Sequence, residues 1–186
     1  MKNSRWKPGI LLGLVAVLVA GMLILQAMYP MKHLDLIEEA SGEYGVPTSL
    51  IAAMIETESG FREVVVSDKG AYGLMQVTEP TALWIAETTG WINDLPEDLK
   101  DPAVNIQYGT WYMRFLLNKY GHEDLALIAY NAGPGTVDRW LSEGTITRED
   151  LSGIPYGETA QYHVRVKRNR EIYQWMYRLD DRLEEE

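Results

Sequence analysis

The sequence contains no cysteine among its 186 residues. A disulfide framework and a thiolate metal site are therefore excluded, and the redox compartment stays unconstrained. Histidine is also rare: the three copies, His33, His122 and His163, lack the spacing of metal ligands and are most simply surface or packing residues. We therefore expect no metal ion and no other cofactor.

Basic residues are scarce relative to acidic ones, with 17 Lys and Arg against 27 Asp and Glu and a formal net charge of −10. This balance argues against nucleic acid as a partner, because phosphate binding requires clustered Lys and Arg. An acidic surface also repels polyanionic substrates, whereas glycan strands with peptide stems are compatible with it. The length leaves room for one domain with a sizeable core.

One long segment has no charge at all: positions 10–28 read ILLGLVAVLVAGMLILQAM. Its length is close to the ~20 residues that a helix needs to cross a bilayer. A secretory signal peptide has a shorter apolar region, of about 7–15 residues, followed by a small-residue cleavage site. Leu25-Gln26-Ala27 matches such a site poorly. We therefore favour an uncleaved transmembrane anchor at residues 9–28 over the alternative, a cleaved signal.

The charges around this segment predict its orientation. Three basic residues precede it, Lys2, Arg5 and Lys7, and only Lys32 lies close after it. Because cytoplasmic flanks carry the excess of Lys and Arg, residues 1–8 should be cytoplasmic and everything from Tyr29 onward should lie outside. The expected location is the cell membrane, crossed once, with the main domain on the extracytoplasmic side.

A helix predicted between Pro47 and Gly60 carries an acidic side chain on its apolar face. Proline is favoured in the first turn of a helix, and glycine just past its end. Three apolar residues precede Glu58 at the spacing of one helix face: Ile51, Met54 and Ile55. Glu58 therefore continues the buried stripe, while Glu56 points the other way.

Two effects are expected to raise the pKa of Glu58. Burial disfavours the ionised form, and the helix C-terminus presents partial negative charge to the carboxyl. A carboxyl that stays protonated near neutral pH can donate a proton to a leaving oxygen. Taken alone, this pattern also fits a surface residue at a frayed helix end.

Several blocks follow in a fixed order. They are Ser59-Gly60-Phe61, Ser67, Gly70-Ala71-Tyr72-Gly73-Leu74-Met75-Gln76, Ala129-Tyr130-Asn131-Ala132-Gly133 and Ile154-Pro155-Tyr156 with Glu158-Thr159. In order and spacing they resemble the core of soluble lytic transglycosylases, a lysozyme-like family that cleaves the glycan strands of peptidoglycan. Several separate blocks are much more specific than one motif. The resemblance covers most of the chain after residue 34.

The resemblance implies a role for individual residues. Glu58 takes the position of the catalytic acid. Seven further residues take substrate-binding positions: Ser59, Ser67, Gln76, Tyr130, Asn131, Tyr156 and Glu158. The Gln76 amide offers two donors and an acceptor to sugar hydroxyls and acetamides. After Glu158-Thr159 the match is incomplete, because Ala160 and His163 replace the usual Arg and Val of the family.

The remaining pattern is that of helices separated by polar loops. Asp101-Pro102 is a helix start signal, and the segment up to Gly121 is apolar nearly all round, which predicts the central buried helix. We expect a loop or small hairpin after Phe61. The predicted fold is all-α, a lysozyme-like helical domain with a small irregular or hairpin segment in the cleft, preceded by one transmembrane helix. The catalytic domain would span residues 29–179, and residues 180–186 would form a solvated acidic tail.

The expected activity is cleavage of the bond between N-acetylmuramic acid (MurNAc) and N-acetylglucosamine (GlcNAc), with Glu58 as general acid and then base. The expected partners are peptidoglycan glycan strands and the membrane, through the N-terminal helix. Hydrolytic glycosidases usually need a second carboxylate about 5–5.5 Å or about 6.5–9.5 Å from the acid. Glu56, Glu63 and Asp68 are poor candidates for it, so we expect a 1,6-anhydro product. The alternatives are a goose-type muramidase that hydrolyses the same bond and a non-catalytic glycan-binding scaffold of the cell envelope.

Overall fold

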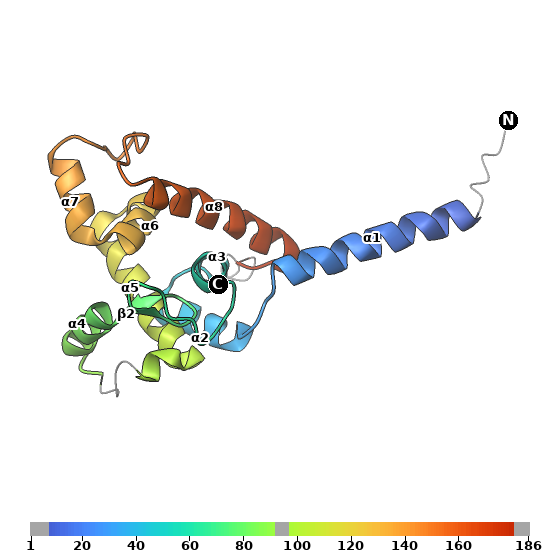
Figure 1. Ribbon diagram of the computed structural model, residues 1–186, viewed down its shortest axis with the longest axis horizontal. Helices are drawn as coiled ribbons and strands as arrows, with labels where there is room; N and C mark the ends of the chain where they lie inside the picture. Colours follow the sequence, from blue (N-terminus) through green and yellow to red (C-terminus); the bar gives the residue numbers. More distant parts are fainter. Residues whose placement is uncertain (1–7, 92–96, 181–186) are drawn as a thin grey trace. The chain divides into compact units, whose positions relative to one another are not determined.

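The computed structural model describes residues 8–91 and 97–180 (Figure 1). The chain divides into two compact units, residues 1–32 and residues 33–186. The first unit contains α1 (Pro8–Met28). Within it, Gly9–Met28 is 20 residues long with a mean hydropathy of 2.6, and none of its most apolar window is buried by protein. By length and composition α1 can cross a membrane, and a signal sequence has the same properties.

In the second unit, five helices pack against one another in a closed circuit. They are α2 (Leu34–Tyr44), α3 (Thr48–Ser59), α8 (Gly157–Tyr177), α6 (Glu123–Ala132) and α5 (Pro102–Tyr120), and α5 packs again on α2. Two further helices flank the circuit, α4 (Glu79–Thr89) on α5 and α7 (Pro134–Ser142) on α6, and a 3-10 helix, η1 (Glu97–Lys100), precedes α5 (Figure 1). The predicted all-α architecture is confirmed.

The most enclosed helix is α3, not the helix of residues 102–120 for which we predicted the central position. Residues 50–55 of α3 have no exposed surface, because α2 packs on one side of the helix and α8 on the other. In α5, by contrast, Trp111 and Phe115 remain partly exposed. A helix that is apolar all round can be enclosed by other helices, or it can leave part of its apolar surface lining a groove. The sequence pattern is the same in both cases.

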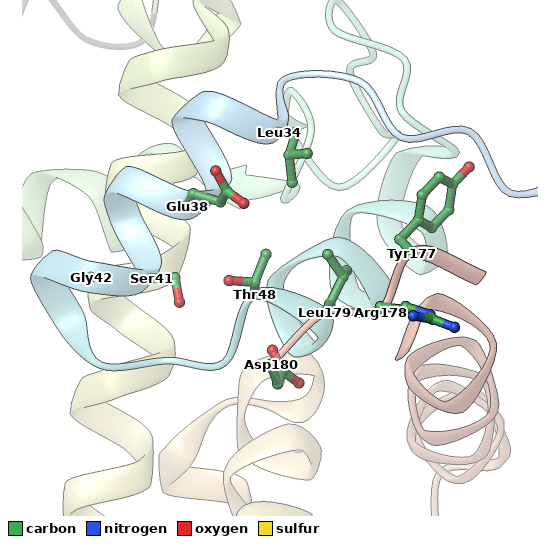
Figure 2. A pocket seen from close by; sticks show the side chains of 9 residues that line it. All are labelled: Leu34, Glu38, Ser41, Gly42, Thr48, Tyr177, Arg178, Leu179 and Asp180. Carbon is green, nitrogen blue, oxygen red and sulfur yellow. The ribbon is translucent and has the colours of Figure 1, made fainter. Parts of the chain in front are cut away.

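The helix α3 begins without a capping side chain of its own. Its N-cap residue is Pro47, which makes no side-chain cap hydrogen bond. Instead, the Asp180 carboxylate accepts hydrogen bonds from the Ser49 backbone N–H, at 3.1 Å, and from the Ser49 hydroxyl. In Figure 2, Asp180 lies beside Thr48 at the start of α3. Asp180 is therefore part of the folded domain, and a solvated tail beginning at residue 180 was a wrong prediction; residues 181–186 lie outside the described part.

The predicted hairpin is present between α3 and α4. It consists of β1 (Ala71–Tyr72) and β2 (Val77–Thr78), which pair antiparallel, with an additional bridge from Val66 to Tyr72. The turn between the strands is fixed by Asn105 of α5, which is fully buried. Its Oδ1 accepts from the Met75 N–H at 2.7 Å, and its Nδ2 donates to the Tyr72 and Leu99 carbonyls at 2.8 Å each.

Gly73 allows Asn105 to approach this turn closely. It has a φ of 73°, and a Cβ there would lie 2.4 Å from the Asn105 Nδ2 and 2.6 Å from the Leu99 carbonyl oxygen. Neither atom can move without breaking the hydrogen bonds described above. Gly70, on the other side of β1, has a similar φ of 71° but open space around it.

We therefore expect Gly73→Ala to be much more destabilising than Gly70→Ala. Both substitutions pay the strain of a positive φ, about 1–2 kcal/mol, but only Gly73→Ala adds a steric clash, for a total of ~3 kcal/mol or more. Urea unfolding of the two variants measures the difference. Equal losses would show that backbone strain alone, and not the approach of Asn105, makes glycine necessary at residue 73.

Candidate active site

Glu58 lies in the last turn of α3, which ends at Gly60 with a φ of 60°. Ile51, Met54 and Ile55 precede it on the same face and are fully buried, as predicted. Glu58 itself keeps some exposed surface, although protein surrounds most of its carboxyl group. Glu56 does not point entirely away from the protein, because it is partly buried and accepts a hydrogen bond from the Tyr173 hydroxyl of α8 at 3.4 Å.

Burial raises the pKa of the Glu58 carboxyl from 4.5 to about 7. The Tyr162 hydroxyl and the positive charge of Arg165 act in the opposite direction, and the negative charge of Glu158 adds to the increase. All three of these residues belong to α8. At neutral pH a substantial fraction of Glu58 is therefore protonated, as a general acid requires.

Two tyrosines from different helices lie close enough to Glu58 for its charge to raise the pKa of their phenols. Tyr162 of α8 is 1% exposed, and its hydroxyl has no partner of full hydrogen-bond geometry among the described residues. Its hydroxyl nevertheless lies close enough to Glu58 to oppose part of the rise in the pKa that burial causes. Tyr130 of α6 is the second, since burial and the charge of Glu58 raise the pKa of its phenol. Sequence reasoning treated Tyr162 only as a packing residue, because its position in a helical stripe carries no other signal.

Met75 connects the hairpin to both walls of the site. Its carbonyl accepts a hydrogen bond from the Tyr130 hydroxyl at 2.9 Å, and its N–H is held by Asn105. Its side chain packs against Gly109 of α5, where a Cβ would lie 2.5 Å from the sulfur. These contacts orient Gln76, which follows with a φ of 50° and donates from its Nε2 to the Gly73 carbonyl at 2.9 Å.

A cleft of about 240 Å³ opens between the hairpin, the middle of α5 and the end of α6, and Glu58 is not among the residues that line it. Its lining includes three of the predicted substrate-binding residues, Gln76, Tyr130 and Asn131. Tyr112 and Thr81 line the same cleft and were not predicted. Asn131 is oriented by Thr159, whose hydroxyl donates to the Asn131 Oδ1 at 2.8 Å. Among the described residues no group of three His, Asp or Glu side chains is suitably placed to hold a metal ion.

A comparison with family models decides which family this site belongs to. The model described as the transglycosylase SLT domain matches residues 35–150. The chain belongs to this family. The SLT match covers Glu58, the hairpin and the Ala-Tyr-Asn-Ala-Gly block, but it ends before α8, which supplies Tyr162, Arg165 and Glu158.

Individual relatives of this SLT domain carry consistent names. The membrane-bound lytic murein transglycosylase C of Edwardsiella ictaluri is 34% identical over 158 residues, which are 76% of this chain and 44% of that protein. The soluble lytic murein transglycosylase of Escherichia coli K12 is 33% identical over 145 residues, which are 74% of this chain and 22% of that protein. The chain thus spans less than half the length of these relatives.

Solved structures agree with the fold. An inactive Glu-to-Gln mutant of the lytic transglycosylase Slt from Pseudomonas aeruginosa has a TM-score of 0.76 and 31% identity, covering 83% of this chain and 26% of that one. The 70-kDa soluble lytic transglycosylase of Escherichia coli has a TM-score of 0.76 and 29% identity, covering 82% of this chain and 26% of that one. A complex of a 70-kDa soluble lytic transglycosylase with bulgecin A matches with the same TM-score at 30% identity, covering 86% of this chain and 27% of that one.

Two serines of the SLT pattern have local structural partners. Ser59 is 1% exposed, and its hydroxyl donates to the Ile55 carbonyl at 3.1 Å within α3. The Ser67 hydroxyl accepts from the Ala71 N–H at 3.0 Å and closes the turn that leads into β1. These positions fit a role in shaping the site better than a direct contact with substrate.

Tyr156 and Glu158 lie at the solvent-exposed start of α8. Tyr156 is 48% exposed and packs edge-on against Trp140, with ring centroids 5.0 Å apart. Glu158 forms an ion pair with Lys69 at 3.0 Å, and both side chains are mostly exposed. Lys69 belongs to the loop before β1, so this pair connects the hairpin side of the SLT domain to α8. Neither residue lines the cleft that contains Gln76 and Tyr130.

A separate hollow of about 220 Å³ lies between α2, the start of α3 and the segment after α8 (Figure 2). Glu38, Ser41, Arg178 and Asp180 are among its polar lining residues. None of the residues predicted for substrate binding lines it. We therefore assign the active site to the cleft beside Glu58 and not to this hollow.

The raised pKa of Glu58 predicts how the stability of the domain depends on pH. Because the folded-state pKa lies above the unfolded one, the folded form binds more protons between pH 4.5 and about 7, so wild-type stability should fall as pH rises through that window. Glu58→Gln removes this dependence and should be more stable than wild type at pH 8 by about 2–3 kcal/mol, with little difference at pH 4. Urea unfolding of both proteins at pH 4 and at pH 8 measures this difference in stability.

Glu171→Gln, which neutralises an exposed glutamate of α8, is the control for the loss of one acidic charge. The assignment of Glu58 as a buried acid would be refuted if both variants gave the same stability difference from wild type at pH 8.

Proposed function

We propose that the protein is a peptidoglycan lytic transglycosylase that cleaves the β-1,4 bond between MurNAc and GlcNAc. The observation that carries this proposal is a carboxyl with a pKa of about 7 whose charge acts on Tyr130, a lining residue of the cleft, in a chain of the SLT family. The naming of several relatives as lytic murein transglycosylases supports it. That one solved relative is an inactive Glu-to-Gln mutant also fits a catalytic glutamate.

In the proposed mechanism Glu58 acts twice. Its protonated carboxyl first donates a proton to the glycosidic oxygen, so the bond from C1 of MurNAc breaks and the GlcNAc hydroxyl leaves. The Glu58 carboxylate then takes the proton of the C6 hydroxyl of the same MurNAc, whose oxygen bonds to C1. The product end is a 1,6-anhydro ring, and Glu58 is protonated again.

Two features favour attack by the C6 hydroxyl over attack by water. The hydroxyl is tethered to the reacting sugar, which gives it the advantage of proximity. Three other carboxylates of the domain also have partners of their own: Glu158 pairs with Lys69, Glu56 accepts from Tyr173, and Glu63 pairs with His33 at 3.0 Å. In this mechanism the Gln76 and Asn131 amides, which line the cleft, bind sugar hydroxyls and acetamides, and Tyr130 and Tyr162 orient the acid.

Digestion of purified sacculi tests the chemistry. Wild-type protein should release fragments one water lighter than the hydrolysis products, as measured by mass spectrometry. Glu58→Gln should lose about 10²–10⁴-fold in rate, because an amide of the same shape has no acidic proton. The Glu171→Gln variant should digest sacculi like wild type.

Each alternative gives a different result in this digest. Reducing muramic ends alone would establish a goose-type muramidase. Binding of sacculi without release of fragments would establish a non-catalytic scaffold. Wild-type activity in Glu58→Gln would exclude Glu58 as the acid.

We also propose that α1 anchors the protein in the cell membrane, with residues 1–8 in the cytoplasm and the SLT domain outside. The relative named membrane-bound lytic murein transglycosylase C is consistent with an anchor. The full chain should fractionate with membranes, and a chain beginning at Tyr29 should be soluble, helical by circular dichroism and active on sacculi. Loss of folding in the shorter chain would show that α1 belongs to the core.

A further inference from the structure

The cleft that contains Gln76 and Tyr130 adjoins a second hollow of about 300 Å³, which is lined by residues of α4, α5 and the start of α7. The two share Thr81 and Tyr112 as lining residues, so they form one groove. Pro134, at the start of α7, lines the far hollow directly after Gly133 of the first. No block that resembles the transglycosylase family includes Trp84 or Phe115, which dominate this far part.

The far part of the groove is built from rings held at fixed angles. Phe115 is nearly parallel to Trp111 and to Tyr112, with interplanar angles of 9° and 7°. Trp84 of α4 crosses these rings edge-on, with its centroid 4.9 Å from that of Phe115 at an angle of 69°. Because three rings support it, the Trp84 indole cannot easily change its orientation.

Trp84 is nevertheless 37% exposed, and its neighbour Leu83 is 48% exposed. An apolar hollow that remains open to water is typical of a binding surface. The continuity with the cleft identifies the occupant, since a glycan strand bound beside Glu58 extends along the groove beyond the bond that is cut. A pyranose ring suits this surface, because its faces carry C–H groups and its hydroxyls lie at the rim.

The charges at the rim also favour a neutral sugar over a peptide stem that carries a carboxylate. Lys119 lines the groove, but its ammonium is paired with the Asp138 carboxylate at 2.7 Å. The Thr81 hydroxyl, which is 2.9 Å from the Thr78 hydroxyl, supplies a polar group without charge at the junction of the two hollows.

We propose that Trp84, supported by Phe115 and Tyr112, is a stacking subsite for a pyranose ring of the glycan strand remote from the bond that Glu58 cleaves. The proposal rests on the proposed function and adds a residue that makes the protein bind long glycan strands more tightly than short ones. Long strands reach Trp84 and gain its stacking, whereas a disaccharide bound beside Glu58 does not.

Binding to the full-length protein in detergent tests the subsite without cleavage, in a Glu58→Gln background. The probes are peptide-free glycan strands and the MurNAc-GlcNAc disaccharide, with dissociation constants from calorimetry. Trp84→Ala should weaken binding of long strands by about tenfold, as expected for the loss of one aromatic contact, and leave disaccharide binding unchanged. Trp84→Phe, which keeps an aromatic plane, should restore most of the affinity.

Trp175→Ala is the matched control, because this tryptophan of α8 is 69% exposed and lines neither part of the groove. It should bind both probes like the parent. If Trp84→Ala fails to fold by circular dichroism, Trp84→Leu replaces it, since leucine keeps apolar volume and removes the aromatic plane.

Several outcomes overturn the subsite. The subsite is refuted if Trp84→Ala binds long strands with the affinity of the parent. It is also refuted if Trp84→Ala loses as much affinity for the disaccharide as for long strands, because such a loss would indicate damage to the cleft. Failure of the proposed function looks different. The parent would then bind neither probe, or Glu58→Gln would cleave sacculi at the wild-type rate while the effect of Trp84→Ala on binding persisted.

Discussion

The enclosure of α3 is the constraint on which the site depends. A carboxyl at the end of a helix whose middle is fully buried loses much of its hydration, and each unit by which its pKa rises corresponds to about 1.4 kcal/mol of preference for the protonated form. That preference costs stability at neutral pH. The packing of α2 and α8 on either side of α3 must offset this cost, so the same contacts that hold the domain together also make Glu58 an acid.

The cleft depends on a second group of contacts, centred on Met75. Its N–H, its carbonyl and its side chain are bound by Asn105, Tyr130 and the surface of Gly109, which belong to α5 and α6. The hairpin is too short to be stable alone, since isolated two-stranded pairs are marginal in water. Its shape is therefore determined by the helices behind it, and Gln76 is positioned through them.

The C-terminal part of the domain completes the site from outside the family match. The helix α8 contributes Tyr162, and Arg165 and Glu158 modulate the charge around Glu58. After α8, Asp180 caps the start of α3, whose own N-cap is a proline. Both ends of the helix that carries Glu58 are thus influenced by residues a hundred or more positions later in the chain.

The sequence by itself determined the helices, most of their ends, the hairpin and the position of Glu58 at the end of an apolar helix face. These features depend on short-range signals: apolar spacing before Glu58, the Asp101 cap, and glycines with a left-handed backbone after the helices. The sequence did not determine which helix is most enclosed. The helix α5 is apolar all round because part of its surface lines a groove, and not because other helices enclose it completely. Only the tertiary structure decided that Tyr162 lies close to Glu58, that Asp180 caps α3, and that Trp84 of α4 packs against Phe115 of α5. Each of these is a contact between elements distant in the chain, and no local pattern specifies such a contact.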